Sequence, residues 1–335
     1  MTIFEPASFS SNNGQNLDKF NLSDFEIGEK ICKLPYGYIS IAKKVKTNQL
    51  YSIKVLRKAD LIQNKYAEHE FNKFHYLSWI YHPFIIEIKA INTTDPYNLF
   101  YLTEFIAGMT LKSLIKANEK LTEDQAKFYL ASLITILDYL HKKKIIYRDL
   151  RPDLIFINNN GYIKMIDFSF SKIMKNDYAY THCGMPEYYS PEMINQSGYN
   201  KSLDFWQLGI LLYEMLVGHS PFIDSEPMKI FQKIKNCKIK FPKNINKNAK
   251  TLIRHFLIVD KNKRLGCTKK GIYEITQSAF FEGFDWEGLL HRNLDPPIIP
   301  KINHIYLTSY KRLEDIHFED NNVPIAKEKD PFYNW

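Results

Sequence analysis

The sequence lacks a cysteine pair, a long apolar run and a sustained basic stripe. None of its four cysteines belongs to a C-x-x-C pair, which disfavours a structural zinc site and a disulfide framework, so we expect free thiols in a reducing compartment. The longest apolar candidate, residues 128–140, contains Ser132, Thr135 and Asp138 and is too short for a membrane span. These absences argue against a small disulfide scaffold and predict that no segment crosses a membrane.

The formal charge of the chain bears on its partners. The sequence carries 45 lysines and arginines against 37 aspartates and glutamates, a net charge of +8. The densest basic clusters, residues 141–144 and 261–264, form no stripe with interleaved aromatic residues, so we expect no nucleic-acid partner. A basic module that binds nucleic acid or phosphoinositide stays open as a minor alternative. A soluble intracellular protein, cytoplasmic by default, is the expectation.

The length of 335 residues exceeds that of one ordinary compact domain and predicts two packed lobes. Strand-forming runs dominate from residue 25 to 105, with one helical stretch between about 60 and 80. Helical periods dominate from about 111 to 281, after which the chain is irregular and proline-rich. We expect four segments: a flexible N-terminal arm at 1–22, a small lobe at 23–105, a large lobe at 106–283 and a tail at 284–335.

Three motifs point to a catalytic chemistry. Residues 147–153 read Y-R-D-L-R-P-D, residues 167–169 read D-F-S, and residues 190–192 read S-P-E. They resemble the catalytic loop, the metal-binding motif and the peptide-lobe anchor of eukaryotic protein kinases. Lys54, in Y-S-I-K, stands where that family has its strand lysine. Nearly without gaps from residue 25 to about 301, the chain resembles the AGC group, and within it the cAMP-dependent type of catalytic subunit.

The resemblance implies a fold of the α+β class. It is the bilobal protein-kinase fold, with a small β-rich N-lobe that holds one main helix, a larger and mostly helical C-lobe, and an AGC-type C-terminal tail that wraps back onto the N-lobe. The final residues resemble the family's terminal F-x-x-F motif, with Phe332 and Trp335 as the aromatics. In the family these aromatics fill an apolar pocket beside the small-lobe helix, and we expect the same docking here.

The resemblance also assigns catalytic and metal-binding roles. Asp149 takes the place of the base that accepts the substrate hydroxyl proton, and Asp167 that of the principal magnesium ligand. Arg151 replaces the catalytic-loop lysine, exchanging a compact ammonium for a broad fork. The family's second metal ligand is an asparagine, and Leu154 stands in its place. Because magnesium requires oxygen ligands, we expect one magnesium site to be lost.

The partner of Lys54 is the next question. A gap-free alignment places Lys73 where the family has the glutamate that pairs with the strand lysine. Two ammonium groups about 4 Å apart repel by roughly 4 kcal/mol at an effective dielectric near 20, so we expect the two lysines to point apart or to recruit an anion. Glu70, about one helical turn earlier, is the alternative partner.

The nucleotide cleft that the family implies is altered as well. Its phosphate loop has three glycines, aligned here with Cys32, Leu34 and Gly37, so the segment is a degenerate phosphate loop or only a hairpin. We expect ATP and magnesium to bind weakly or not at all, with purine contacts retained or with Phe156 and Leu34 filling the space. The family positions that would line the cleft are Lys54, Gly37, Ile39, Ser52, Thr103, Glu104, Ile106 and Phe156.

A regulatory site follows from the same resemblance. Thr181 stands at the family's activation-loop phosphorylation position, and the basic residues that bind that phosphate correspond to His69, Arg148 and Lys172. Phosphorylation would order the loop through charge-assisted hydrogen bonds. An unmodified loop threonine is the alternative.

Substrate selection also departs from the family. Its arginine-reading glutamates correspond to Thr110, Asp153 and Glu214, so the first acid is missing and the second is shortened. We therefore expect no strong preference for basic peptides. Glu214 alone also fits a structural pair inside the large lobe.

These departures predict a pseudokinase that acts as a structural or regulatory binding module. Protein partners would bind the C-lobe and the tail, and a regulatory subunit or a larger assembly is the candidate partner. The alternative is an active ATP-dependent serine/threonine protein kinase that uses Asp149, Asp167 and Lys54 with Glu70 turned inward.

Overall fold

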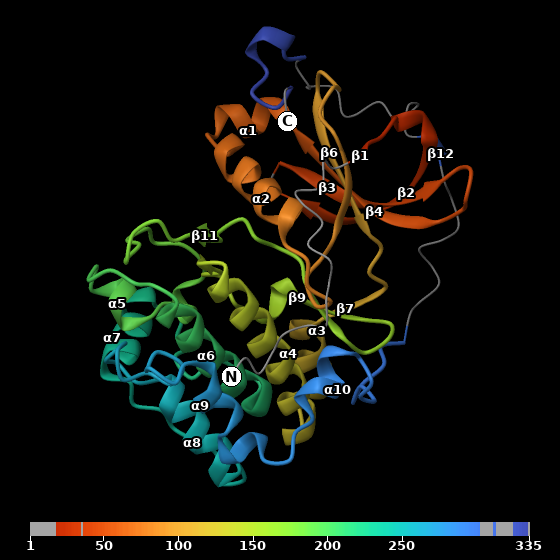
Figure 1. The fold of residues 1–335 in the computed structure, drawn as a ribbon. Coiled ribbons are helices and arrows are strands. Elements are labelled where there is room, and N and C mark those ends of the chain that lie inside the picture. The colour runs from red at the N-terminus through yellow and green to blue at the C-terminus, as the bar shows by residue number, and fades with distance from the viewer. Residues whose placement is uncertain (1–17, 35, 302–310, 313–323, 334–335) are drawn as a thin grey trace. The chain divides into compact units, whose positions relative to one another are not determined.

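The computed structural model describes residues 18–34, 36–301, 311–312 and 324–333. Two compact units make up the chain (Figure 1). The β-rich unit lies within residues 10–81, 86–108 and 301–335, and the helical unit contains residues 82–85 and 109–300. The predicted α+β class, with a β-rich lobe and a mostly helical lobe, is confirmed.

A twisted sheet of seven strands forms the β-rich unit, in the order β1-β5-β6-β4-β3-β2-β12. All neighbouring pairs are antiparallel except β1 with β5, which is parallel. Among the described residues of this unit, two α-helices and two short 3-10 helices accompany the sheet. The elements are β1 (Asp18–Lys19), η1 (Leu22–Asp24), β2 (Phe25–Leu34), β3 (Gly37–Lys44), β4 (Leu50–Arg57), α1 (Lys58–Gln63), α2 (Ala67–Trp79), β5 (Ile88–Asn92), β6 (Asn98–Glu104), β12 (Lys311–Arg312) and η7 (Lys327–Lys329).

The two faces of this sheet differ because side chains alternate along each strand. Ile53 and Val55 of β4 point to one face, where they join a buried apolar cluster with Phe100 and Leu102 of β6. Lys54 lies between them in sequence and points to the opposite face. Helix α2 contacts that second face, and this places the helix beside Lys54.

The sequence predicts one helical stretch between about 60 and 80, and the structure has two helices there. Helix α1 ends at Gln63, and α2 begins at Ala67. The break falls at Lys65, whose φ of 59° lies in the left-handed region that helices do not contain. The predicted helical stretch is thus divided into two helices, and the break sets where the turns of α2 begin.

The helical unit is built around α6, a helix that is apolar on nearly every side and buried along almost its whole length. Helices α4 and α8 pack against it. A capping box of Thr122 and Gln125 starts α4, and Gly218, with a φ of 97°, ends α6. The α-helices are α3 (Leu111–Asn118), α4 (Glu123–Lys142), α5 (Pro191–Ile194), α6 (Ser202–Val217), α7 (Pro227–Asn236), α8 (Lys247–Phe256), α9 (Ile272–Thr276) and α10 (Trp286–Leu290).

Short strands and 3-10 helices lie between the α-helices of the helical unit. A three-stranded sheet has the order β10-β9-β7, and a two-stranded one pairs β11 with β8. These elements are β7 (Gly108–Thr110), β8 (Ile145–Ile146), η2 (Pro152–Leu154), β9 (Ile155–Asn158), β10 (Ile163–Met165), β11 (Lys172–Ile173), η3 (Pro186–Tyr188) and η4 (Ala279–Phe281).

The ends of the predicted segments differ in part from the structure. Strand β1, at residues 18–19 of the predicted arm, pairs with β5. Residues 284–300 of the predicted tail belong to the helical unit and include α10, which Asp285 caps by accepting a hydrogen bond from Gly288 N. Residues 324–333 belong to the β-rich unit, where Phe332 is fully buried. Trp335, the other predicted aromatic, lies outside the described residues.

Within the described ranges, no helix combines the length and apolar character needed to cross a bilayer.

Candidate functional site

Lys54 and Glu70 form an ion pair in the β-rich unit. The ammonium of Lys54, on β4, lies 3.2 Å from Glu70 Oε1 and 3.5 Å from Oε2. Both side chains are largely buried, at 17% and 9% exposed. Lys54 Nζ also lies 5.9 Å from the centre of the Tyr101 ring. The carboxylate of Glu70 thus fixes the position of the Lys54 ammonium.

This pair resolves the question that the sequence left open. Glu70, rather than the residue at position 73, pairs with Lys54. Residues 70 and 73 are three apart on α2 and therefore neighbours on one face of the helix. A gap-free alignment cannot decide between such neighbours. The ion pair that the resemblance implies is thus present, and its acid is Glu70, three residues before the position that the gap-free alignment gives.

The predicted cleft positions of the β-rich unit lie close together on β3, β4 and β6. Ile39 is the register partner of Lys54, and Ser52 is the partner of Thr103. Thr103 Oγ1 donates to the backbone oxygen of Ser52 at 3.4 Å. Glu104 Oε1 accepts from the backbone N–H of Glu87 at 3.0 Å, so this carboxylate has a structural role. Ile106, just beyond β6, is partly exposed.

Gly37 has a structural reason to be a glycine. It begins β3 and pairs with Leu34 of β2 across a two-residue hairpin connection. A Cβ at Gly37 would lie 1.9 Å from the backbone oxygen of Val55, closer than any real contact. The close approach of β3 to β4 therefore requires a glycine here, whether or not the hairpin also binds phosphate.

The predicted catalytic loop is held by buried polar groups of α6. The Asp204 carboxylate accepts from the backbone N–H groups of Tyr147 and Arg148 at 3.0 and 2.8 Å. Gln207 accepts from Leu150 N–H and donates to Arg148 O, each at 3.0 Å. Arg148 itself has a φ of 72°. These bonds fix the backbone on both sides of residue 149 and compensate the strain of that left-handed conformation.

Asp149 is buried, at 5% exposed, and is paired with Arg151. Arg151 Nε donates to both carboxylate oxygens, at 3.2 and 3.3 Å. Burial raises the pKa of Asp149, and the charge and hydrogen bonds of Arg151 act against that rise. A Cβ at Gly184 would lie 3.0 Å from Asp149 Oδ1, so glycine there leaves room for the carboxylate. Arg151 Nη1 also lies 3.5 Å from the sulfur of Met185.

Asp167 follows β10 and accepts hydrogen bonds from its neighbour Ser169. Oδ1 accepts from Ser169 N–H at 3.0 Å and from the Ser169 hydroxyl at 2.6 Å. Leu154 ends η2, and its backbone oxygen accepts from Ile166 N–H at 3.2 Å. The side chain of Leu154 has no oxygen, and its carbonyl is already hydrogen-bonded. Position 154 therefore offers no side-chain ligand for a hard cation.

The residues present fit the family's cofactors only in part. Lys54 with Glu70 fits an anionic phosphate, and Asp167 fits one magnesium ion whose remaining ligands come from the nucleotide and water. Position 154 does not fit a second magnesium ion. Among the residues that the structure describes, no three His, Cys, Asp or Glu side chains are grouped to hold a metal ion.

Phe156, the remaining predicted cleft residue, lies on β9, is partly exposed and belongs to the helical unit.

Thr181 and Arg148, two residues of the predicted phosphorylation site, both contact Tyr199. Thr181 is exposed, and its backbone oxygen accepts from the Tyr199 hydroxyl at 2.6 Å. Arg148 Nη1 donates to Tyr199 at 3.0 Å, and Arg148 Nε donates to Phe170 O. Arg148 is thus already hydrogen-bonded beside Thr181.

The other two predicted phosphate-binding residues lie in different units. Lys172 lies on β11 of the helical unit and is partly exposed. His69 lies on α2 of the β-rich unit and is exposed, with its ring 5.2 Å from that of Tyr66. A phosphate-binding pocket made by Arg148, Lys172 and His69 therefore stays a prediction.

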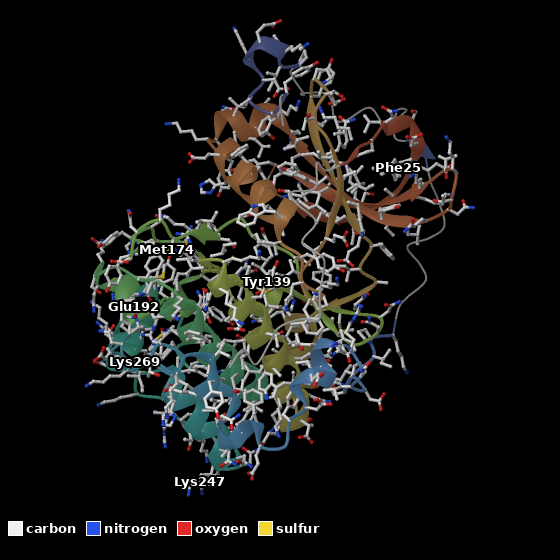
Figure 2. All side chains as sticks on the ribbon, viewed as in Figure 1. Phe25, Tyr139, Met174, Glu192, Lys247 and Lys269 are labelled. Atoms are coloured by element: carbon white, nitrogen blue, oxygen red, sulfur yellow. The ribbon has the colours of Figure 1, made fainter. Side chains whose placement is uncertain are left out.

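A buried ion pair anchors the peptide-lobe motif. Arg264 is fully buried, and its Nη1 and Nη2 donate to the two carboxylate oxygens of Glu192 at 2.7 and 2.9 Å. Burial would raise the pKa of Glu192, but the bonds and charge of Arg264 outweigh this effect and lower it. Glu192 is labelled in Figure 2, which shows it on α5 in the helical unit. This two-bond pair has the geometry in which arginine binds carboxylates most strongly.

Sequence reasoning missed two ion pairs. Lys58 Nζ binds Asp330 Oδ2 at 2.5 Å in the β-rich unit, and Lys112 Nζ binds Glu214 Oε1 at 2.8 Å in the helical unit. Both pairs join residues more than one hundred positions apart. No local pattern marks such pairs. The only signal was the suggestion that Glu214 could form a structural pair inside its lobe.

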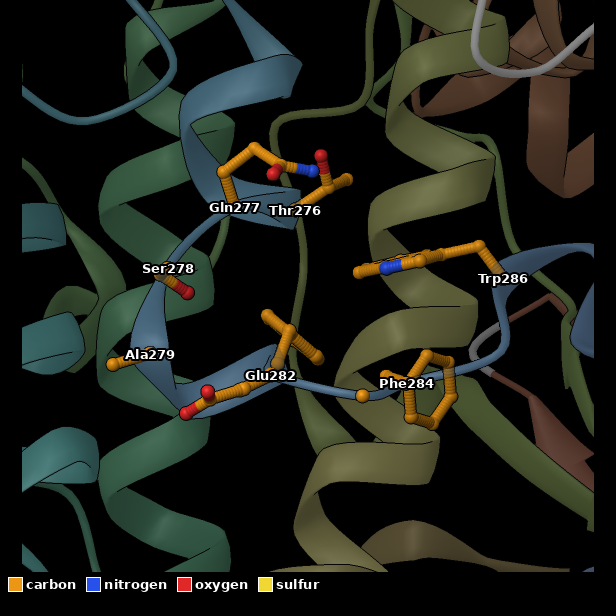
Figure 3. A pocket seen from close by; sticks show the side chains of 9 residues that line it. Thr276, Gln277, Ser278, Ala279, Glu282, Phe284 and Trp286 are labelled. Atoms are coloured by element: carbon orange, nitrogen blue, oxygen red, sulfur yellow. The ribbon is translucent and has the colours of Figure 1, made fainter.

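A shallow pocket lies elsewhere in the helical unit, between α9 and α10 (Figure 3). Its volume is about 460 Å³, and Trp286, Phe284 and Thr276 are among its lining side chains. Glu282 is its single titratable carboxylate. It holds no group of residues suited to acid–base or metal chemistry, and it coincides with none of the predicted site residues.

Comparisons with known proteins give the family. The model of the protein kinase domain matches residues 25–281. A protein of Caenorhabditis elegans named "cAMP-dependent protein kinase, catalytic subunit-like" is 33% identical over 320 residues, which cover 95% of this chain and 79% of that protein. The "cAMP-dependent protein kinase catalytic subunit PRKX" of Homo sapiens is 36% identical over 283 residues, 84% of this chain and 78% of that protein. The "cAMP-dependent protein kinase type 3" of Saccharomyces cerevisiae is 36% identical over 284 residues, which cover 85% of this chain and 71% of that protein.

The match includes the motifs described above that lie between Lys54 and Arg264. The chain therefore belongs to the protein kinase family, with catalytic subunits of cAMP-dependent protein kinase among its relatives.

Proposed function

We propose that this chain is a kinase-fold binding module that transfers phosphate very slowly or not at all. The observation that carries the proposal is the lack of a metal ligand at Leu154, whose side chain has no oxygen and whose carbonyl binds Ile166 N–H. Phosphoryl transfer depends on metal ions that neutralise the developing charge on the phosphate. The metal ligands and the catalytic carboxylates act as a unit in phosphoryl transfer. Asp149 and Asp167 therefore cannot replace the ligand that is missing at position 154.

The state of Asp149 supports the same proposal. Arg151 Nε donates to both of its oxygens, so the carboxylate that would accept a hydroxyl proton already accepts from an arginine. The single Nε–H of Arg151 is shared between the two oxygens, and the delocalised charge of the guanidinium lies beside the carboxylate. Arg151 lowers the pKa of Asp149, although burial leaves that pKa above its ordinary value, so the support lies in the occupied carboxylate oxygens.

The test is a phosphotransfer assay with ATP, magnesium and generic serine and threonine peptides. The wild-type chain is compared with Asp149→Asn, which removes the base and keeps the shape of the side chain. The proposal predicts equal, background-level incorporation for both proteins. Activity that the substitution abolishes would overturn it.

A second candidate function is an active ATP-dependent serine/threonine protein kinase. The Lys54–Glu70 pair favours it, since an ion pair of this kind is one of the parts that active kinases need. Asp149 and Asp167 are also retained. A thermal-shift measurement with ATP, with and without magnesium, gives the first indication, because a ligand that binds the folded state raises the melting temperature. No shift at millimolar nucleotide would count against this candidate.

Protein partners fit both candidates. Several relatives are named as catalytic subunits, and we infer that this chain also works with a protein partner, either a regulatory subunit or a larger assembly. The helical unit exposes Tyr180, Ile223 and Met228, at 62%, 49% and 66%. Contiguous exposed apolar patches mark protein-binding surfaces, and these side chains are the candidates for such a patch. A partner that binds there should be lost from pull-downs when Met228→Lys is used in place of the wild-type chain.

A further inference from the structure

Lys112 and Glu214 form an ion pair that joins α3 to α6 in the helical unit. Lys112 Nζ lies 2.8 Å from Glu214 Oε1, and the Tyr188 hydroxyl donates to the other oxygen, Oε2. The Glu214 side chain is 2% exposed, whereas that of Lys112 is 51% exposed. The carboxylate is therefore fixed inside the unit, and the lysine covers it from the solvent side.

Two more carboxylates act on the same lysine. Burial lowers the pKa of Lys112, but the hydrogen bond and charge of Glu214, together with the charges of Asp153 and Glu187, outweigh this effect and raise it. Lys112 is thus bonded to Glu214 and also interacts electrostatically with Asp153 and Glu187. The charge of Lys112 in turn lowers the pKa of Glu187, although burial and the charge of Glu214 leave that pKa raised.

The position of Lys112 in its helix gives it no local reason to be a lysine. It is the second residue of α3, whose N-terminal turn contains no acidic residue. A positive charge in the first turn opposes the helix dipole, which favours negative charge there. Thr110 already caps the helix by accepting from Ser113 N–H at 3.0 Å. The contact with Glu214 is therefore what favours a lysine at this position.

The pair lies next to the predicted catalytic loop. Asp153 Oδ2 lies 3.4 Å from Arg151 Nη1, and Arg151 is the residue that pairs with Asp149. Asp153 therefore connects the group around Lys112 to Asp149. A peptide bound with a hydroxyl near Asp149 would present a neighbouring side chain to Lys112 and Glu214.

We propose that Lys112 determines which peptides this surface accepts. It neutralises Glu214 from within the chain, so that a lysine or arginine of a bound peptide meets a carboxylate that is already paired. The surface then takes peptide segments with an uncharged side chain at this point. This inference rests on the proposed binding function and concerns the peptide chemistry of the same site.

The test measures peptide binding by fluorescence anisotropy without nucleotide, so that its outcome is independent of phosphotransfer. Two labelled peptides are used, one with two arginines and one with glutamines in the same positions. They are titrated with the wild-type chain, with Lys112→Gln, and with Lys116→Gln, an exposed lysine of the same helix that serves as the control. The double variant Lys112→Gln with Asp153→Asn tests whether the carboxylates that lose Lys112 account for any tighter binding of the arginine peptide.

We expect the wild-type chain and Lys116→Gln to show no preference for the arginine peptide. In Lys112→Gln the arginine peptide should bind on the order of tenfold more tightly than the glutamine peptide, because the carboxylates have lost their cation. The double variant should lose part of this gain. A wild-type chain that already prefers the arginine peptide tenfold would overturn the proposal. So would an unchanged preference, or no detectable binding, in Lys112→Gln.

Discussion

Lys58 and Asp330 form a buried ion pair, 2.5 Å long, between residues that are 272 positions apart in sequence. Their side chains are 0% and 3% exposed. Lys58 Nζ also donates to the backbone oxygens of Thr93 and Asp95, so the ammonium is surrounded by acceptors. The pair fixes residues 324–333 in the β-rich unit, beside the fully buried ring of Phe332.

The first prediction follows from this pair. Asp330→Ala should lower the free energy of unfolding of the β-rich unit by roughly 3–5 kcal/mol, because it leaves the buried Lys58 ammonium without its counter-charge. Urea denaturation followed by tyrosine and tryptophan fluorescence measures the loss. Glu328→Ala, an exposed acid on the same segment, is the control and should be almost neutral. Equal midpoints for the two variants would show that the ion pair does not hold the segment.

The second prediction concerns Lys54 and Glu70. Glu70→Gln should reduce the thermal stabilisation that ATP gives, because Lys54 loses the carboxylate that holds it in place. It should also cost about 2 kcal/mol of stability, less than a fully buried pair because Lys54 is partly exposed. Glu68→Gln, on an exposed position of α2, is the matched control. An ATP effect that survives Glu70→Gln unchanged would mean that nucleotide does not use Lys54.

The third prediction is a pH dependence at Glu192. The pKa of this carboxyl is lowered in the folded chain, so the ionised form binds Arg264 and stabilises the fold. That contribution is fully present above the ordinary value of 4.5 and is lost as the pH falls through the lower, folded value. The difference in unfolding free energy between wild type and Glu192→Gln should therefore be large at pH 7 and should shrink below pH 4.5. A difference that stays constant from pH 7 to pH 3 would contradict this.

Local motifs were enough to propose a catalytic loop, whereas the tertiary contacts that hold it could not be read from the sequence. Asp149 and Asp167 lie in short motifs whose spacing is preserved, and α6 holds the loop through Asp204 as a kinase would. Glu70 was only an alternative, because residues 70 and 73 share one face of α2 and the break at Lys65 is invisible to a gap-free alignment.

The long-range pairs show the limit of sequence reasoning more clearly. Lys58 and Asp330 come together only when the last residues pack against the sheet, and neither has a periodic or capping signature. Lys112 pairs with Glu214 although both lie on separate helices 102 residues apart. Composition and periodicity predict which face of a helix is buried, and they do not predict which charge on another element that face will meet.

The fourth prediction is a gain of function at position 154. Leu154→Asn would add an oxygen ligand where the chain has none, so phosphate transfer to peptide should rise at least about tenfold over the wild-type chain. Leu154→Val, which changes shape without adding oxygen, is the matched control. The gain should vanish when Asp149→Asn is added. No increase in Leu154→Asn would mean that the missing ligand is not what limits transfer.

The most direct measurement of the central claim is a count of bound metal ions. Mn²⁺ can be titrated into the chain with a non-hydrolysable ATP analogue, and electron paramagnetic resonance reports the free ion. Because the Leu154 side chain supplies no oxygen, we predict at most one Mn²⁺ bound per wild-type chain. We predict a second bound Mn²⁺ in Leu154→Asn. Two tightly bound Mn²⁺ ions per wild-type chain would contradict the account.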